Sequence, residues 1–509
     1  MSRSTMRSKF ISLIGGLIAV AMIVTGCTGN GAGNGNGEGK SDTLVIGAVA
    51  HPPTMDAVTN DSAAIPQVLL YNVYETLVKM GSDGELQPLL AQRWEVSPDN
   101  LTYTFHLDPA AKFASGKDVT SSDVKHSIER IQAGGSVTNV LQGQMEVVES
   151  VDDSDKSVAV IKLKRPSNAW LYNMTSTGGM IFDAESDTDL ATDTAGSGPY
   201  QLKQWNQGDS VVLERNEQYW ATPQPFREVT FRYFTDPNAM NNAMLSGDLD
   251  IISNLQAPQA IDQFSDTSRF QIIEGTTSGE VVLAMNHENK ALADVRVRRA
   301  IMHAIDRQAL IDTVWNGHGT LIGSMASPTD PWYEDLSSEY DYDPEKAKKL
   351  LAEAGYANGL TLRLRLPVLP YATSGGQFVA SQLREVGINA TIDELEFPAR
   401  WLDVVLTKAD YDMTIVAHVE PRDMVKYADP KYYWRYNNPE FQKLMTEADA
   451  GSHDDYVAKM REGAKMLNED AAANWLFLLP NLIVAREGIN GLPENMTSLS
   501  FDLTNVTAR

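Results

Sequence analysis

Strand-like and helix-like patterns alternate through the second half of the chain, and this alternation limits the possible folds more than any other feature. Leu360 to Leu366 alternates apolar and polar residues, as a half-buried strand does. A helical pattern from Gln377 to Val386 ends at Gly387, and a second strand pattern, Ile388 to Leu395, follows. Because strands joined by helices form parallel sheets, the sequence predicts an α/β fold in this half.

The length of the chain requires more than one hydrophobic core. One core stops growing at roughly 250–300 residues, and the chain has 509 residues. We therefore expect two or three domains. Two helical patterns in the body are Gln67 to Val78 and a helix capped by Asp294 that continues to Ala309. The arginines on the latter helix, Arg296, Arg298 and Arg299, are expected to be surface charges.

The first 42 residues are expected to lie outside the folded body. Basic residues precede a mostly apolar run, Phe10 to Val24, in the order typical of a secretory signal peptide. This run is shorter than the about 20 residues that a membrane span needs. Val24-Thr25-Gly26-Cys27 resembles a bacterial lipobox, in which the cysteine thiol receives a lipid. We expect residues 1–26 to be a lipoprotein signal peptide and residues 27–42, rich in Gly and Asn, to be a flexible tether.

Cys27 is the only cysteine, so the chain makes no internal disulfide. In an exported protein a free thiol is a liability that acylation removes. The alternative is a plain signal peptide with an incidental cysteine. The chain carries 42 basic and 67 acidic residues, a net charge of −25, which argues against attraction to nucleic acid or anionic lipid. We expect lipid on Cys27 to anchor the protein at the extracytoplasmic face of the bacterial cytoplasmic membrane.

Four groups of short motifs follow one another in the body of the chain. In chain order they are Leu86-Gln87-Pro88 with Leu89-Leu90-Ala91, Phe113 with Ser115-Gly116-Lys117, Ser197-Gly198-Pro199-Tyr200 with Tyr219-Trp220, and Asp294-Val295-Arg296 with Ala304-Ile305-Asp306-Arg307. In this order they resemble the peptide/nickel family of bacterial extracellular solute-binding proteins, which includes the oligopeptide- and dipeptide-binding proteins. The resemblance extends from about Thr43 to Leu492. Most of these motif residues are expected to be structural.

The resemblance implies an α/β fold with two lobes, the large form of the class II periplasmic-binding-protein-like fold, and an extra α+β domain inserted in lobe one. Placed on this sequence, lobe one comprises residues 43–60, 182–274 and 488–509. The inserted domain comprises residues 61–181, and lobe two comprises residues 275–487.

The same resemblance implies the substrate-binding subunit of an ABC importer. Such a protein captures oligopeptides or dipeptides in a cleft between its lobes, closes about a hinge and delivers its cargo to a membrane permease. We expect a monomer that has no catalytic residue, metal site, cofactor or nucleic-acid partner. Alternative cargoes are a nickel complex, an oligosaccharide or an opine-like compound. A distant alternative is a secreted hydrolase, but the sequence contains neither Gly-x-Ser-x-Gly nor His-Glu-x-x-His.

The candidate ligand site lies before Asp429-Pro430. Peptide-binding relatives hold the ligand α-amine with an acid placed three residues before an acidic-Pro pair, because a charge-assisted bond is stronger than a neutral one. Lys426 has that position here, and Asp423 and Glu420 are the nearest acids. Arg422 is a candidate partner for a ligand carboxylate, and aromatic residues are candidate apolar walls. The expected ligand-binding set is Trp401, His418, Glu420, Arg422, Asp423 and Tyr427.

Overall fold

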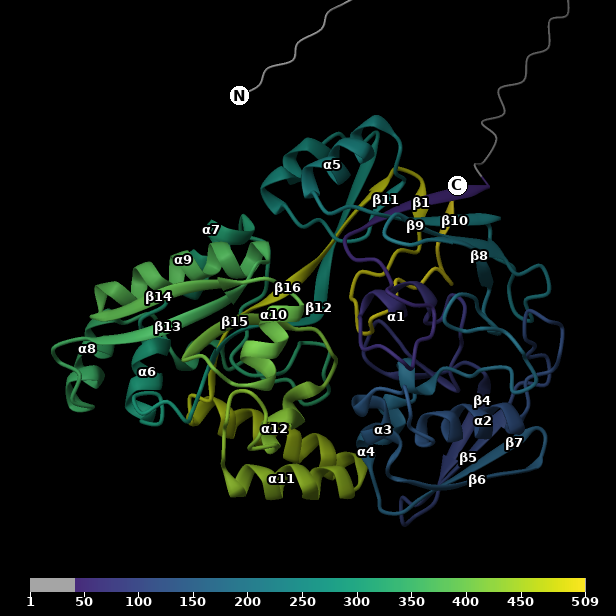
Figure 1. Cartoon of the computed structure of the whole chain (residues 1–509), viewed down its shortest axis with the longest axis horizontal. Coiled ribbons are helices and arrows are strands. Elements are labelled where there is room, and N and C mark those ends of the chain that lie inside the picture. Colours follow the sequence, from purple (N-terminus) through teal and green to yellow (C-terminus); the bar gives the residue numbers. More distant parts are fainter. Residues whose placement is uncertain (1–41, 509) are drawn as a thin grey trace, which may run out of the picture. The chain divides into compact units, whose positions relative to one another are not determined.

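The computed structural model describes residues 42–508, and its main feature is a ten-stranded sheet (Figure 1). The strands lie in the order β14, β13, β15, β12, β16, β11, β1, β10, β9 and β8. Their bounds are β1 Thr43–Ala48, β8 Tyr200–Asn206, β9 Ser210–Arg215, β10 Glu228–Tyr233, β11 Ile251–Ile252, β12 Phe270–Met285, β13 Leu360–Pro367, β14 Ile388–Leu395, β15 Met413–His418 and β16 Ala473–Arg486. The two strands predicted at residues 360–366 and 388–395 are therefore confirmed.

The long antiparallel strands β12 and β16 carry the sheet from one half to the other. In one half, the first part of β12 pairs with the last part of β16, and β16 pairs there with β11. In the other half, the last part of β12 pairs with the first part of β16, and β12 pairs there with β15. The register shifts between Thr276 and Glu280, so the ladder of hydrogen bonds is interrupted between the two halves. Such an interruption permits the strands to bend at this point.

The half that contains β13, β14 and β15 has two cores. β13 is parallel to β14 and β15, as predicted, but β12 is antiparallel to β15, so the sheet is mixed. The first core includes side chains of α6 Val295–His303, α7 Arg307–Trp315, α8 Pro344–Glu353 and α9 Pro370–Glu385. The second includes side chains of α10 Ala399–Trp401, α11 Pro439–Ala450 and α12 His453–Glu469.

Side chains along β12 alternate between these two cores. Val281, Leu283 and Met285 belong to the first core, whereas Val282 and Ala284 belong to the second. Alternation of this kind is the geometry of a strand buried on both faces. The Glu280 side chain therefore lies on the same face of β12 as Val282 and Ala284, the face that packs against the second core.

The other half combines the remaining strands of the large sheet with smaller elements. A four-stranded antiparallel sheet has the order β4, β5, β7, β6. The bounds of the smaller elements are α1 Ala64–Leu69, β2 Val78–Met80, β3 Leu86–Pro88, β4 Ala91–Val96, β5 Thr102–Leu107, α2 Ser121–Gln132, α3 Asn139–Met145, β6 Val148–Asp155, β7 Val158–Leu163, α4 Asn168–Asn173, α5 Pro237–Ser246, β17 Ile489–Asn490 and β18 Thr507–Ala508. One core joins residues of this sheet to β1, β9, β10 and the C-terminal segment, and a second core lies around α5.

Several of the motif residues converge on one buried carboxylate, that of Glu75. Ser197 Oγ and Trp220 Nε1 each donate to Glu75 Oε2 at 2.9 Å, and the Tyr219 hydroxyl donates to Oε1 at 2.9 Å. Gly198 lies so close to the backbone of residue 72 that an added Cβ would come within 2.6 Å of its carbonyl oxygen. These motifs therefore have a structural role here, which agrees with the structural interpretation of the sequence.

The helix predicted from Gln67 to Val78 is wrong after residue 69. Tyr71 has a left-handed φ of 64°, and the chain reverses there. The Asn72 amide holds this reversal, because its Nδ2 donates to the Phe501 carbonyl at 2.9 Å and its Oδ1 accepts from the Leu503 amide at 2.9 Å. The C-terminal segment thus decides the local conformation.

The continuous helix predicted from Asp294 to Ala309 is divided in two. Asp306 caps the start of α7 by accepting from the Ala309 amide at 2.9 Å. Arg298 is buried rather than exposed, contrary to the prediction, because its guanidinium donates to the carbonyls of residues 292, 293, 470 and 471. These bonds join α6 to the segment before β16.

The predicted signal peptide and lipid-anchor residue Cys27 lie outside the described residues. Within residues 42–508, no helix is both long enough and apolar enough to cross a bilayer.

Candidate functional site

The candidate site begins where β15 ends, at His418. This residue lies directly opposite Glu280 in the antiparallel pairing of β15 with β12. Directly opposed residues project their side chains to the same face of a sheet, so both look toward the second core. His418 is buried, and its Nδ1 donates to Asp423 Oδ2 at 2.8 Å while its Nε2 lies 2.9 Å from the Tyr433 hydroxyl.

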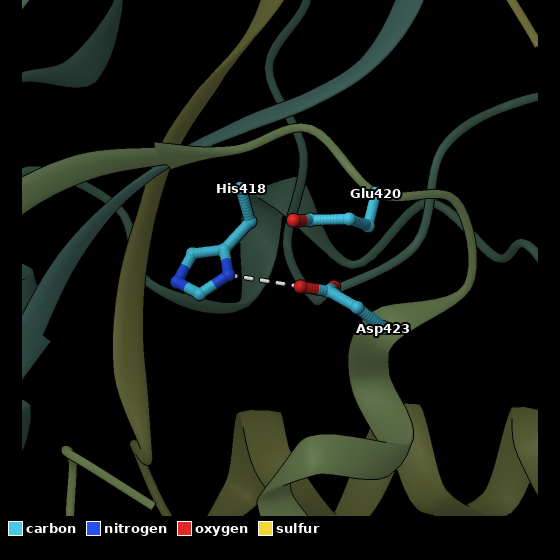
Figure 2. A group of neighbouring side chains, drawn as sticks. All are labelled: His418, Glu420 and Asp423. Atoms are coloured by element: carbon cyan, nitrogen blue, oxygen red, sulfur yellow. Dashed lines mark hydrogen bonds and ion pairs between the residues drawn. The ribbon is translucent and has the colours of Figure 1, made fainter. Parts of the chain in front are cut away.

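The segment after β15 brings the predicted polar residues together. Arg422 adopts a left-handed φ of 64°, which turns the chain into the short helix η5 Asp423–Ala428. Figure 2 shows the carboxylates of Glu420 and Asp423 on the same side of the His418 ring. Lys426 lies one turn further on, with Nζ 3.5 Å from Asp423 Oδ2 and 3.7 Å from Glu420 Oε2.

The charges of this cluster stabilise one another. Burial by itself would raise the pKa of the Asp423 carboxyl, but His418 and Lys426 outweigh it and hold that pKa below its ordinary value. Burial by itself would lower the pKa of the Lys426 ammonium, but the charges of Asp423 and Glu420 outweigh burial and raise that pKa above its usual range. Asp423 is therefore a buried carboxylate in the ionised form.

The His418, Glu420 and Asp423 ligand atoms lie within 4.8 Å of one another, which is a spacing suited to a metal ion. The surrounding contacts do not fit a metal ion coordinated by all three residues. Both ring nitrogens of His418 already have hydrogen-bond partners, and the Lys426 ammonium lies beside both carboxylates. A metal would have to displace these groups, so the cluster is better described as an internally neutralised set of charges.

Arg422 joins this segment to the half of the molecule that contains α4. Its guanidinium carbon lies 3.3 Å from the centre of the Tyr172 ring and 5.0 Å from that of Trp332. Its Nη2 donates to the Gly84 carbonyl at 3.4 Å, and its Nε is 3.9 Å from Asp330. The candidate site therefore lies where residues 84 and 172 meet residues 330 and 422.

The predicted aromatic residues pack in the second core. Tyr427 stacks on Trp434 with ring centres 3.8 Å apart, and Trp401 is buried with its Nε1 donating to Thr414 Oγ1 at 3.2 Å. Contact of Tyr427 or Trp401 with a ligand stays a prediction.

Several buried polar atoms around the site have no hydrogen-bond partner among residues 42–508. They include Glu280 Oε2, Arg422 Nη1, Asp423 Oδ1 and the Tyr427 hydroxyl. A buried polar group without a partner costs roughly 1–3 kcal/mol. Both acceptors and donors are present, so the arrangement suits a solute that carries polar groups of both kinds.

Sequence reasoning identified the segment from His418 to Tyr427 but missed Glu280, Tyr433, Asp330 and Tyr172. Each of these lies far from that segment in the sequence or has an ordinary pattern around it. Glu280 follows Gly279 at the start of an apolar run, a position that is as common for a surface residue as for a buried one. The sequence signal that could have revealed Glu280 is that this single acidic residue precedes five apolar residues, Val281 to Met285.

Comparison with known proteins places this geometry in context. The sequence profile described as "Bacterial extracellular solute-binding proteins, family 5 Middle" matches residues 85–443. The probable D,D-dipeptide-binding periplasmic protein DdpA of Escherichia coli (strain K12) is 28% identical over 470 residues, which cover 86% of this chain and 88% of DdpA. Heme-binding protein A of Haemophilus influenzae is 26% identical over 444 residues, which cover 79% and 80% of the two chains.

Among solved structures, AgaA from A. tumefaciens R10 in complex with agropinic acid superposes with a TM-score of 0.77 at 25% identity, over 92% of this chain and 99% of AgaA. These likenesses confirm the predicted α/β fold of two lobes. The ligands after which two of these proteins are named and the ligand in the AgaA structure differ from one another, so the fold alone does not select a solute.

Proposed function

Since the chain belongs to family 5 of the bacterial extracellular solute-binding proteins, we propose that it captures oligopeptides or dipeptides for an ABC importer. Proteins of this family are extracytoplasmic binding components of importers of the peptide, nickel and opine type. The residues of the site support a peptide cargo.

The observation that carries the proposal is the set of unpartnered buried atoms beside Arg422. Asp423 Oδ1 is an ionised acceptor that suits a ligand ammonium, and Arg422 Nη1 is a donor that suits a ligand carbonyl or carboxylate. A peptide offers both groups, together with a main chain that binds largely independently of its sequence. Of the predicted set, we propose His418, Glu420, Arg422 and Asp423 as the polar wall, and Trp401 and Tyr427 as apolar support.

Capture is proposed to occur by closure about β12 and β16. The interrupted ladder at Thr276 and Glu280 is where these strands pass between the halves. Arg422, on one side, contacts Tyr172 and Gly84 on the other. A solute that touches both sides favours the closed form, by no more than its difference in affinity for the two forms.

The domain division expected from the sequence is proposed with its original bounds: residues 43–60, 182–274 and 488–509 for lobe one, 61–181 for the inserted domain and 275–487 for lobe two. Two cores consist of residues between Val281 and Leu478, which supports lobe two. The C-terminal residues Phe501 and Leu503 share a core with β1, which supports their place in lobe one.

We further propose that lipid on Cys27 holds a monomer at the outer face of the cytoplasmic membrane, where it delivers its cargo to a permease. The lipobox-like sequence and the tether support the anchor.

A non-peptide cargo, such as an opine-like compound, is the second candidate. Lys426 has the position at which peptide-binding relatives carry the amine-binding acid, and the similar protein AgaA was solved with agropinic acid. Lys426 forms ion pairs with Glu420 and with Oδ2 of Asp423. The other Asp423 oxygen, Oδ1, therefore remains available to the ligand.

The test is native mass spectrometry of the protein purified from its own source, followed by calorimetry with the co-purified solute and with alanyl-alanine. We expect a bound solute of peptide composition that is released unchanged. A non-peptide solute would select the second candidate. Absence of any bound solute together with no binding of alanyl-alanine would contradict the proposal, and hydrolysis of the peptide would point to the hydrolase alternative.

A further inference from the structure

The short helix α4 lies at the boundary between the half that contains the four-stranded sheet and the half that contains β15. Trp170 of this helix belongs to the core of its own half, whereas Tyr172 packs against the second core of the other half. On the far side of the boundary α11 ends at Ala450. Figure 1 shows α4 beside this end of α11. The two helices therefore meet although they belong to different proposed domains.

The Asp449 carboxylate, near the end of α11, has all of its hydrogen bonds among residues 42–508 with the other half. Its Oδ1 accepts from Ser167 Oγ and from the Ala169 amide, each at 2.9 Å. Arg165 Nη1 donates to its Oδ2 at 2.9 Å. Because the three donors belong to the segment around the start of α4, this carboxylate joins the two halves and adds no side-chain bond within its own half.

The Asn168 amide makes the reciprocal contact. Its Nδ2 lies 2.8 Å from the Gly451 carbonyl, 3.1 Å from the Asp449 carbonyl and 3.3 Å from the Ala448 carbonyl. The last carbonyls of a helix have no partner inside that helix, so they are free to accept from another part of the chain. Asn100 adds a longer bond of the same kind, with Nδ2 3.4 Å from the Gly451 carbonyl.

This contact differs from the contact that Arg422 makes with Tyr172 and Gly84. Arg422 belongs to the candidate ligand-binding set, so a solute can alter its contact directly. The contact between α4 and α11 uses no residue of that set. Its donors and acceptors are all groups of the protein, so these bonds do not require a solute to form.

α11 also connects this contact to the candidate site. Phe441 and Met445 of α11 share the second core with Met424 and Tyr427, which belong to the helix η5 that begins at Asp423. Close-packed side chains transmit displacements because interiors have few voids. A movement of α11 away from α4 would therefore be felt at η5.

We propose that Asp449 and Asn168, with the partners named above, form a latch that holds the closed form without cargo. This inference rests on the proposed solute-binding function and adds how closure is controlled. The latch shifts the equilibrium toward the closed form by the free energy of its own bonds, and the solute adds its contribution separately. Cargo enters and leaves after the latch opens, so the latch sets the rates of loading and unloading.

The experiment measures a distance between the halves in ligand-free, full-length protein extracted from membranes. Spin labels are attached through Lys156→Cys in the proposed inserted domain and Lys349→Cys in proposed lobe two, both of which are exposed positions. Double electron–electron resonance then gives the populations of short and long separations, and native mass spectrometry verifies that no solute is bound. The latch variants are Asp449→Ala and Asn168→Ala. The matched control is Asp454→Ala, which removes an exposed acid at the start of α12.

We expect the short separation of the closed form to be the main population of the wild type. Asp449→Ala should lower the ratio of closed to open form roughly 10-fold, because three donors lose their acceptor. Asn168→Ala should shift the ratio in the same direction, and Asp454→Ala should leave it unchanged. A cooperative thermal transition establishes that each variant is folded. Arg165→Ala is a milder latch variant, since the Arg165 side chain is 65% exposed, and it should shift the ratio roughly 2-fold.

Stopped-flow kinetics with alanyl-alanine provide a second measurement. Both the association and the dissociation rate constants should rise several-fold in the latch variants, because the solute passes through the open form in both directions. The affinity should change less than either rate constant. A carboxylate that only stabilised the fold would not accelerate association.

A long separation in the ligand-free wild type that only a solute shortens would overturn the inference. Equal populations in the wild type and all three latch variants would overturn it too, as would faster dissociation without faster association. Failure of the solute-binding function would instead appear as no bound solute and no binding of alanyl-alanine. The distance measurement on ligand-free protein does not depend on that result, so the two failures can be told apart.

Discussion

Glu75 provides the sharpest test of the electrostatics of this fold. Its carboxylate is fully buried and accepts hydrogen bonds from Ser197, Tyr219 and Trp220. Burial raises the pKa of Glu75 to about 7 from an ordinary value of 4.5, although these three donors lower it. The perturbation is a change of pH from 5 to 8, compared between the wild type and Glu75→Gln.

The expected magnitude follows from the two pKa values. One pKa unit is worth about 1.4 kcal/mol, so the gap between 4.5 and about 7 is worth ~3 kcal/mol. Between these pH values the folded state keeps a proton that the unfolded chain has lost. The free energy of unfolding therefore falls as pH rises from about 4.5 to about 7, and the loss is complete above that range. The amide of the Glu75→Gln variant does not titrate, so the loss should be absent in that variant.

Hydrogen exchange of the segment from Ser197 to Trp220 is the suitable assay, because the chain has several cores and unfolding need not be two-state. The amides of Tyr200 and Asn216 bond to the carbonyls of Asn72 and Pro199 and report opening of this region. After correction for intrinsic exchange, we expect the wild type to lose ~3 kcal/mol of opening free energy relative to the variant between pH 5 and pH 8.

The control is Glu85→Gln, which changes an exposed glutamate in the same half and should leave the pH profile of the wild type unchanged. A difference between wild type and Glu75→Gln that is the same at pH 5 and pH 8 would refute the reasoning. It would mean that the Glu75 carboxyl ionises in the folded state as it does in the unfolded chain.

Three further changes test other parts of the structure and its proposed anchoring. Cys27→Ser should release the protein from membranes while solute affinity stays the same; retention of the variant in the membrane fraction would contradict the anchor. Asp423→Asn should weaken binding of a solute that carries an amine by about 2–5 kcal/mol, because a buried cation loses its partner; calorimetry that finds equal affinity would remove Asp423 from the site. Arg298→Lys should lower the free energy of unfolding by about 2 kcal/mol, because a point charge cannot reach the four carbonyls that the guanidinium binds; an unchanged urea midpoint would argue that these bonds contribute little.

Elements that short-range signals specify could be predicted from the sequence. The helical pattern from Gln377 to Val386, which ends at Gly387, corresponds to the later part of α9, because apolar periodicity and a terminal glycine act within a few residues. The alternation in residues 360–366 likewise predicted β13 correctly. The helix predicted from Gln67 to Val78 ends at Leu69 instead, because the Asn72 side chain bonds to Phe501 and Leu503, which are far away in the sequence.

The candidate site likewise has one part that could be predicted from the sequence and another part that only the structure reveals. The segment from His418 to Tyr427 could be located from the sequence, because the resemblance assigns a role to the residues before Asp429-Pro430. That Asp423 is buried between His418 and Lys426, and that Arg422 lies over Tyr172, could not be read from the sequence. Glu280 became part of the site through the register of β12 against β15.

The sequence by itself determined the helices and strands with strong local signals, the need for several cores, and the family to which the chain belongs. The tertiary structure alone decided which polar side chains are buried together and which of their atoms lack partners. The physical reason is range: caps, turns and apolar periodicity act over a few residues, whereas burial and charge pairing join residues that are hundreds of positions apart.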